Sequence, residues 1–196
     1  MRIAITGSHG VGKSTLVNDL LNYLNSKEFG SKINITDLNS ASERKNFKLL
    51  DEAPRQAFEL GLPINENNSP ETQLWVFAKQ LEMELIAQNY YIADKCFIDL
   101  LAYVMYIFRE RRDLIDTLKD ISRRAARKYD LVIYLPAGEF PIEDDGVRST
   151  DPEFQEGVDK LILEILNDFG ISYVKITGNK EERYNQAVEL IGNLLK

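Results

Sequence analysis

The first fifteen residues constrain this chain more than any other stretch of it. Residues 2–6 read Arg-Ile-Ala-Ile-Thr, a short and largely apolar run that predicts a strand. Residues 7–14 read Gly-Ser-His-Gly-Val-Gly-Lys-Ser, which fits the pattern G-x-x-x-x-G-K-[ST] at every fixed position. A strand, a glycine-rich loop and a helix in this order are the context in which that pattern binds phosphate. The apolar residues that predict the helix are Leu16, Val17, Leu20, Leu21 and Leu24.

Each fixed position of this loop has a physical task. Gly7, Gly10 and Gly12 allow backbone angles that other residues avoid, so successive N–H groups can turn inward and, with the helix N-terminus, attract an anion. Lys13 reaches the outer phosphates, and Ser14 offers a hydroxyl ligand to Mg²⁺. The sequence therefore predicts a nucleoside triphosphate site, with ATP and Mg²⁺ as the expected ligands. The residues expected to hold the nucleotide are Gly7, Ser8, His9, Gly10, Val11, Gly12, Lys13, Ser14 and Thr15.

Length, charge and cysteine content narrow the class of protein. A chain of 196 residues suits one domain, residues 1–196. Twenty-four basic and 31 acidic residues give a net charge of −7, which makes nucleic acid an unlikely general partner. Cys96 is the only cysteine, which excludes an internal disulfide and fits a reducing compartment. No secretory signal and no run of about 18 apolar residues are present, so we expect a cytoplasmic protein that crosses no membrane.

Strand-like and helix-like segments alternate along the chain. This alternation predicts an α/β fold with a parallel sheet covered by helices on both faces. Strands are expected at residues 2–6, 47–50, 90–93, 131–135 and 171–176, with a further short strand considered at 33–35. Helices are expected between them, at residues 13–25, 54–61, 70–85, 97–109, 113–128, 158–169 and 184–195. For the helix after Pro70, the expected buried stripe is Leu74, Phe77, Ala78, Leu81 and Leu85.

Parallel sheets of this kind bind ligands at the carboxyl ends of their strands. Asp94 ends the third predicted strand, where its carboxylate can help Ser14 to hold Mg²⁺. The alternative is that Asp94 caps the helix near Phe97. Lys95 either contacts phosphate or is solvated, and Asp99, one turn into that helix, can orient Lys95.

The second predicted strand ends in another group of polar residues. Glu52 can accept the proton of an attacking hydroxyl, and Arg55 can bind a substrate anion through two hydrogen bonds. The simpler alternative is an acidic helix start followed by an exposed arginine. Gln73 lies on the next helix and can read the edge of a base, whereas Trp75 and Phe77 are expected in the core.

Residues 136–150 form a proline- and glycine-containing loop after the fourth strand, and we expect this loop to act as a lid. Arg148 can neutralise the charge that develops during phosphoryl transfer, and Asp145 is expected near the substrate. The alternative is a solvated turn. His9 occupies a free position of the phosphate loop and is expected to fill space, and Cys96 to be a small buried apolar residue.

Four segments carry a resemblance to a known family. They are residues 6–15, 52–55 (Glu-Ala-Pro-Arg), 94–103 (Asp-Lys-Cys-Phe-Ile-Asp-Leu-Leu-Ala-Tyr) and 144–148 (Asp-Asp-Gly-Val-Arg). Together they resemble the P-loop kinase-like AAA-type ATPase family that includes the nicotinamide-riboside kinase domain of NAD biosynthesis regulators. The order of motifs is also similar to that of thymidylate and deoxynucleoside kinases. The resemblance implies a three-layer fold with a five-stranded parallel sheet of order 2-3-1-4-5, and ATP-dependent transfer to a small acceptor. The family often has Arg where this sequence has Lys95, and Lys is a point charge without a bidentate fork.

The sequence therefore predicts a kinase that transfers the γ-phosphate to a small nucleoside, nucleotide or related metabolite. Its catalytic residues are expected to be Lys13, Glu52, Asp94 and Arg148. One alternative is an ATPase or nucleotide switch acting with a protein partner. Another is a kinase of a hydroxyl on a polynucleotide or modified base, for which a basic face would come from Arg109, Arg111, Arg112, Arg123, Arg124 and Arg127. Oligomeric state stays open, with a homodimer as one option.

Overall fold

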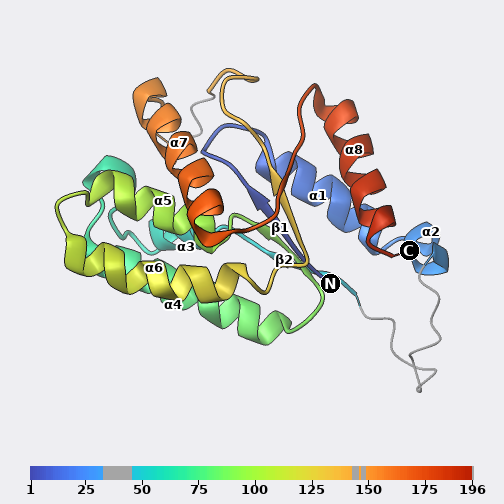
Figure 1. Cartoon of the computed structure of the whole chain (residues 1–196), viewed down its shortest axis with the longest axis horizontal. Coiled ribbons are helices and arrows are strands. Elements are labelled where there is room, and N and C mark those ends of the chain that lie inside the picture. Colours follow the sequence, from blue (N-terminus) through green and yellow to red (C-terminus); the bar gives the residue numbers. More distant parts are fainter. Residues whose placement is uncertain (33–45, 143–145, 147–148, 196) are drawn as a thin grey trace.

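The computed structural model describes residues 1–32, 46–142, 146 and 149–195. The strand considered at residues 33–35 lies outside these residues. Five strands form one parallel sheet in the order β2-β3-β1-β4-β5, which confirms the predicted architecture and order (Figure 1). Their bounds are β1 Arg2–Thr6, β2 Lys48–Leu50, β3 Tyr91–Asp94, β4 Leu131–Tyr134 and β5 Val174–Lys175.

The helices lie in two layers, one on each face of the sheet (Figure 1). Ile3 and Ile5 of β1 pack in the cluster that contains the inward side chains of α1 and α8, whereas Ala4 belongs to the cluster formed mainly by α4, α5, α6 and α7. Side chains of successive strand residues point to opposite faces, so one strand serves both layers. The helix bounds are α1 Lys13–Leu24, α2 Lys27–Lys32, α3 Ala53–Glu59, α4 Pro70–Ala87, α5 Phe97–Ile107, α6 Arg112–Ala126, α7 Pro152–Phe169 and α8 Lys180–Asn193, with a short 3-10 helix at Asn65–Asn67.

The fifth strand is shorter than predicted. β5 covers only Val174–Lys175, although residues 171–176 were expected to be extended as a strand. It lies at the edge of the sheet and pairs with β4 alone, at Ile133 and Tyr134. An edge strand has a neighbour on one side only, so its regular pairing ends as soon as it diverges from that neighbour.

The buried stripe expected on α4 is wrong apart from Phe77, which is 4% exposed. Leu74, Leu81 and Leu85 are 49%, 40% and 64% exposed, and Ala78 is also exposed. The inward face is instead largely polar, because its polar groups have partners. For example, the Gln80 amide donates to Glu84 Oε1 at 3.1 Å and the Tyr129 hydroxyl donates to the same oxygen at 2.7 Å. The buried residues of α4 are Thr72, Gln73, Val76, Phe77, Gln80, Glu84 and Ala87.

Candidate active site

The phosphate loop connects β1 to α1 through backbone angles that require glycine. Gly12 is the N-cap of α1 and has φ 85°, in the left-handed region. Gly7 has φ 150°, and a Cβ atom there would collide with the carbonyl oxygen of Leu135. The loop can therefore turn its N–H groups inward only with glycine at these positions.

Three buried side chains from later parts of the chain hold this loop in place. Asp99 Oδ1 accepts a hydrogen bond from the Gly7 N–H at 2.9 Å. Gln155 on α7 donates to the His9 carbonyl at 2.7 Å, and Arg183 on α8 donates to the Val11 carbonyl at 2.5 Å. Sequence reasoning missed Gln155 and Arg183, since neither belongs to a motif and only the packing of α7 and α8 brings them to the loop.

Lys13 lies within the loop that it belongs to. Lys13 is 4% exposed, and its ammonium group donates to the carbonyl oxygens of Gly7, at 2.8 Å, and Ser8. Burial, followed by repulsion from Lys95, lowers the pKa of Lys13. A buried cation that donates to neutral carbonyl oxygens can exchange them for anionic phosphate oxygens. The hydroxyl oxygens of Thr6 and Ser8 are also buried and without a hydrogen-bond partner in the described part of the chain.

Two carboxylates meet Ser14 beside the loop. β2 pairs with β3 at Leu50 and Ala93, and β3 pairs with β1 at Asp94 and Ile5, so these strands end at the same edge. The Ser14 hydroxyl lies 3.4 Å from Glu52 Oε1 and also hydrogen-bonds with Asp94. Burial, and then repulsion from Glu52, raises the pKa of Asp94 to about 6. Because the Glu52 and Asp94 carboxylates repel each other, their proximity favours binding of a cation between or beside them.

The chemistry of these groups fits Mg²⁺. A hydroxyl and two carboxylates are hard oxygen donors, and Mg²⁺ typically takes only one or two protein carboxylates while phosphate and water complete its shell. Asp94 Oδ1 is buried without a hydrogen-bond partner among the described residues. Among the described residues, no group of three or more His, Cys, Asp or Glu side chains is placed to hold a metal ion.

Lys95 is buried next to the second strand end, so the solvated alternative is wrong. Its ammonium group lies 3.2 Å from Glu52 Oε2 and 5.0 Å from the centre of the Tyr103 ring. Burial lowers the pKa of Lys95, but the interactions with Glu52, Tyr103, Asp94 and Asp99 together outweigh it and raise this pKa above its usual value. The Tyr103 hydroxyl lies 2.9 Å from His9 Nδ1. The expected filler residue His9 thus belongs to a buried polar network that continues to Glu52.

Asp99, not Asp94, takes part in capping the N-terminus of α5, the helix that follows β3. The N-cap of α5 is Cys96, and Asp99 Oδ2 accepts from the Cys96 N–H at 2.8 Å. The capping alternative for Asp94 is therefore wrong. That Asp99 orients Lys95 stays a prediction; its charge acts on Lys95. Cys96 is fully buried as predicted, and burial raises the pKa of its thiol well above the usual value.

The remaining predicted residues fall into three groups. Arg55 is half-buried in the first turn of α3, the helix that begins directly after Glu52. The backbone N–H of Arg55 donates to the Glu52 carbonyl oxygen at 3.1 Å. Gln73 is buried on α4, and within the described ranges no hydrogen bond joins it to the carboxylates of Glu52 or Asp94. Asp145 and Arg148 lie outside the residues that the structure describes.

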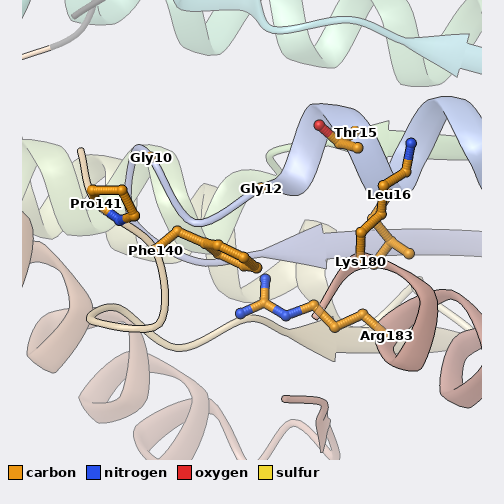
Figure 2. Close-up of a pocket in the computed structure, with 8 residues that line it drawn as sticks. All are labelled: Gly10, Gly12, Thr15, Leu16, Phe140, Pro141, Lys180 and Arg183. Atoms are coloured by element: carbon orange, nitrogen blue, oxygen red, sulfur yellow. The ribbon is translucent and has the colours of Figure 1, made fainter. Parts of the chain in front are cut away.

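A cavity of about 270 Å³ borders the phosphate loop on the side of α8. Figure 2 shows the Arg183 guanidinium beside the Phe140 ring, next to the loop between Gly10 and Gly12. The guanidinium carbon lies 4.5 Å from the ring centre, and Glu139 pairs with Arg183 at 2.7 Å. The lining residues are Gly10, Gly12, Thr15, Leu16, Phe140, Pro141, Lys180 and Arg183. Phe140 and Pro141 belong to the loop 136–150 that was expected to act as a lid, whereas Lys180 and Arg183 were not predicted at the site.

The arginines considered as a basic face are partly neutralised. Arg111 makes two hydrogen bonds to Asp113, at 2.9 and 2.7 Å, and Arg123 pairs with Asp168 at 3.2 Å.

None of the helices in the described ranges combines the length and apolar character needed to cross a bilayer.

Comparison with known proteins identifies the family. The model of an AAA domain matches residues 2–183. This chain belongs to that family. A comparison with curated proteins finds no match.

Solved structures with similar folds come from nucleotide-related kinases and their relatives. The structure of NadR protein in complex with NR matches with a TM-score of 0.74 and 16% identity, covering 99% of this chain and 51% of the NadR chain. This chain thus spans about half the length of NadR. Thymidylate kinase from Ehrlichia chaffeensis matches with a TM-score of 0.61, 20% identity and 98% coverage of that enzyme. Deoxyadenosine kinase from M. mycoides matches with a TM-score of 0.57, 18% identity and 98% coverage. These likenesses show that the fold is that of the P-loop kinases.

Proposed function

We propose that residues 1–196 act as one P-loop kinase domain that transfers the γ-phosphate of ATP to a small nucleoside, nucleotide or related metabolite. The observation that carries this proposal is the buried group of Glu52, Lys95 and Asp94 beside Ser14, at the end of the phosphate loop. The nucleoside and nucleotide kinases of similar fold support the same class of reaction.

The donor half of the site is assigned to the loop and to the cavity beside it. Lys13 would exchange the carbonyl oxygens of Gly7 and Ser8 for the β- and γ-phosphates, and the loop N–H groups would bind the remaining phosphate oxygens. The cavity between Phe140 and α8 has room for part of the base and ribose, and the Phe140 ring offers a stacking surface.

Ser14 and Asp94 would hold Mg²⁺, with Glu52 near enough to contribute through water. When bound, Mg²⁺ neutralises charge on the β- and γ-phosphates. The raised pKa of Asp94 means that part of this carboxyl is protonated near neutral pH without a cation. A bound cation would release that proton.

The acceptor half is assigned to Glu52 and its surroundings. Glu52 would accept the proton of the acceptor hydroxyl while the hydroxyl oxygen forms a bond to the γ-phosphorus. At the same time the bond between the γ-phosphorus and the β–γ bridging oxygen would break, and ADP would leave. The ion pair with Lys95 would hold the Glu52 carboxylate in position. Arg55 and Gln73 are proposed to bind the acceptor, with Asp145 and with Arg148, which would stabilise the transferring phosphoryl group.

The proposal is tested by acceptor-dependent ADP release. Purified protein with ATP and Mg²⁺ is assayed against nucleosides, nucleoside monophosphates and nicotinamide riboside, and products are identified by mass spectrometry. We expect at least one acceptor to be phosphorylated. Glu52→Gln should lower kcat about 100-fold or more while ATP binding changes little, because a general base contributes about 10²–10⁴. Glu59→Gln, at the exposed end of the same helix, is the matched control.

Two outcomes would refute the assignment. ATP hydrolysis that is indifferent to every metabolite but rises with a protein partner would favour a nucleotide switch. Phosphorylation of a polynucleotide, with binding that falls steeply with salt, would favour the nucleic-acid alternative.

We also propose the cytoplasm as the compartment, since the single cysteine is a buried thiol.

A further inference from the structure

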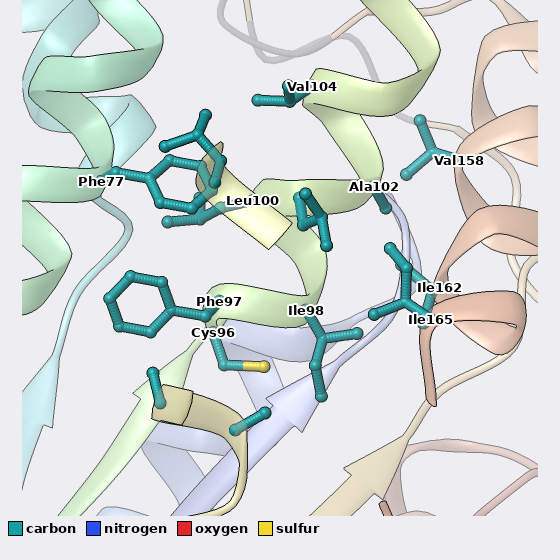
Figure 3. Packing of buried hydrophobic residues seen from close by; sticks show 14 of the residues in the cluster. Phe77, Cys96, Phe97, Ile98, Leu100, Ala102, Val104, Val158, Ile162 and Ile165 are labelled. Atoms are coloured by element: carbon teal, nitrogen blue, oxygen red, sulfur yellow. The ribbon is translucent and has the colours of Figure 1, made fainter. Parts of the chain in front are cut away.

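Helix α7 presents two polar side chains to the phosphate loop. Figure 3 shows Val158, Ile162 and Ile165 of α7 on the side that faces α5, and all three are buried in the core, so the rotation of α7 about its axis is fixed. Gln155 and Asp159 are four positions apart and therefore project from successive turns of one side of the helix. Gln155 uses this side to bind the His9 carbonyl. Asp159, one turn further on, reaches the neighbouring residue of the loop.

Hydrogen-bond donors surround the Asp159 carboxyl. The hydroxyl of Tyr134, the last residue of β4, donates to Oδ2 at 2.6 Å. Burial raises the pKa of Asp159, whereas this hydroxyl and the backbone N–H groups of Ala137 and Ser8 lower it, as does the charge of Lys13. An ionised carboxylate accepts hydrogen bonds on both oxygens and donates none, so it suits a position that faces several donors.

One oxygen of this carboxyl lacks a hydrogen bond. Asp159 Oδ1 is buried, and none of the described residues donates to it with ordinary geometry. Buried polar atoms are nearly always hydrogen-bonded, so an open one needs an explanation. The Ser8 N–H is near, and hydrogen bonds at active sites are often long in the free protein and shorten when the substrate binds.

We propose that Asp159 is a positioning residue for the phosphate donor, and that its Oδ1 accepts the Ser8 N–H when a triphosphate occupies the loop. This inference rests on the proposed function, since it concerns the ATP half of that site. In the free protein the Ser8 carbonyl accepts from the Lys13 ammonium group. When Lys13 turns to the phosphates, Ser8 loses that contact, and the hydrogen bond from its N–H to Asp159 takes over the task of holding it.

The charge of Asp159 gives the inference a distinctive sign. A carboxylate near the phosphate loop repels the phosphates of ATP. If Asp159 had no positioning role, its neutralisation would therefore strengthen ATP binding. If Asp159 holds Ser8, the same change weakens ATP binding, because the loop loses a contact in the complex.

ATP titration by calorimetry, with Mg²⁺ and without an acceptor, tests this sign. Asp159→Asn keeps the size of the side chain but replaces one acceptor oxygen by an NH₂ donor. We expect the Kd for ATP to rise about 10-fold or more, as for the loss of a hydrogen bond to a charged group. Glu156→Gln is the matched control, because Glu156 is an exposed carboxylate on the same helix, and its Kd should equal that of the wild type.

Tyr134→Phe provides a second, independent variant. It removes the hydroxyl that fixes Oδ2, so it should weaken ATP binding in the wild type and add little to the loss in Asp159→Asn. The KM for the acceptor should change in neither variant, since β4 and the Glu52 end of β2 lie on opposite sides of β1.

Three results would overturn the inference. They are equal or tighter ATP binding by Asp159→Asn, additive losses in the double variant, and unchanged ATP affinity in Tyr134→Phe, which remains informative if Asp159→Asn does not fold in urea-unfolding controls. Failure of the kinase assignment is a different observation. A wild type that binds ATP and phosphorylates no acceptor would refute that assignment, while the ATP affinities of the variants would still decide the role of Asp159.

Discussion

Asp94→Asn should stabilise the protein in the absence of nucleotide and metal. Burial and the nearby Glu52 raise the pKa of Asp94 to about 6, from its ordinary 3.8. Above pH 6 the carboxylate is ionised in both states, and ionisation is less favourable in the folded protein than in the unfolded chain. A difference of about two pKa units corresponds to about 3 kcal/mol, so removing the charge should raise the free energy of unfolding by up to that amount at pH 8.

Urea unfolding in EDTA at several pH values measures this effect. The gain should be full at pH 8, shrink as the pH falls through about 6, and vanish near pH 4, where the folded-state carboxyl is already protonated. Asp113→Asn is the control, because Asp113 is exposed and its hydrogen bonds to Arg111 lower its pKa to about 2. That variant should not stabilise the protein.

Magnesium and ATP should reverse the order of the two proteins. Ligand that binds only the folded state adds stability in proportion to the logarithm of its concentration over its dissociation constant. The wild type should gain this stability, whereas Asp94→Asn should gain less and lose Mg²⁺-dependent turnover. A variant that is less stable than the wild type at pH 8, or equally stabilised at pH 4 and pH 8, would refute the assignment of a strained carboxylate.

Three further predictions concern other parts of the molecule. Lys13→Ala should abolish phosphoryl transfer by removing the cation on the outer phosphates, and near-normal turnover would mean that the loop does not act in catalysis. Arg148→Ala should lower kcat more than it weakens ATP binding in a titration, and equal losses would contradict a role confined to transfer. Gly157→Ala should destabilise the protein by about 1–3 kcal/mol in urea unfolding, although alanine normally favours a helix, because its Cβ would collide with the ring of Tyr106.

The phosphate loop and the alternation of strands with helices were predictable because both depend on patterns local in the sequence, whereas the strand order was implied by the resemblance to the P-loop kinase-like family. The loop motif and the short apolar runs identify themselves, and the rule that ligands bind at strand ends selects Glu52 and Asp94 without knowledge of packing. The structure brings Lys13, Ser14, Glu52 and Asp94 together, as the rule predicts. Their roles in catalysis stay predictions.

The rest depends on contacts between distant segments. Leu74, Leu81 and Leu85 of α4 were expected to be buried because apolar residues at this spacing usually mark the inward face of a helix, but all three are exposed. Gln80 and Glu84 became inward residues only because Tyr129, 45 positions after Glu84, supplies a partner. Lys95 has no sequence signal that distinguishes a solvated lysine from one paired with Glu52 across two strands.

The contact between Arg183 and the Val11 carbonyl spans 172 positions of sequence and has a consequence for synthesis of the protein. The phosphate loop is synthesised long before α8, which helps to hold it. A nascent chain that lacks α8 carries the complete loop motif without the guanidinium that fixes it. A chain truncated before α8 should therefore bind nucleotide more weakly than one that contains it, because the phosphate loop loses the Arg183 contact.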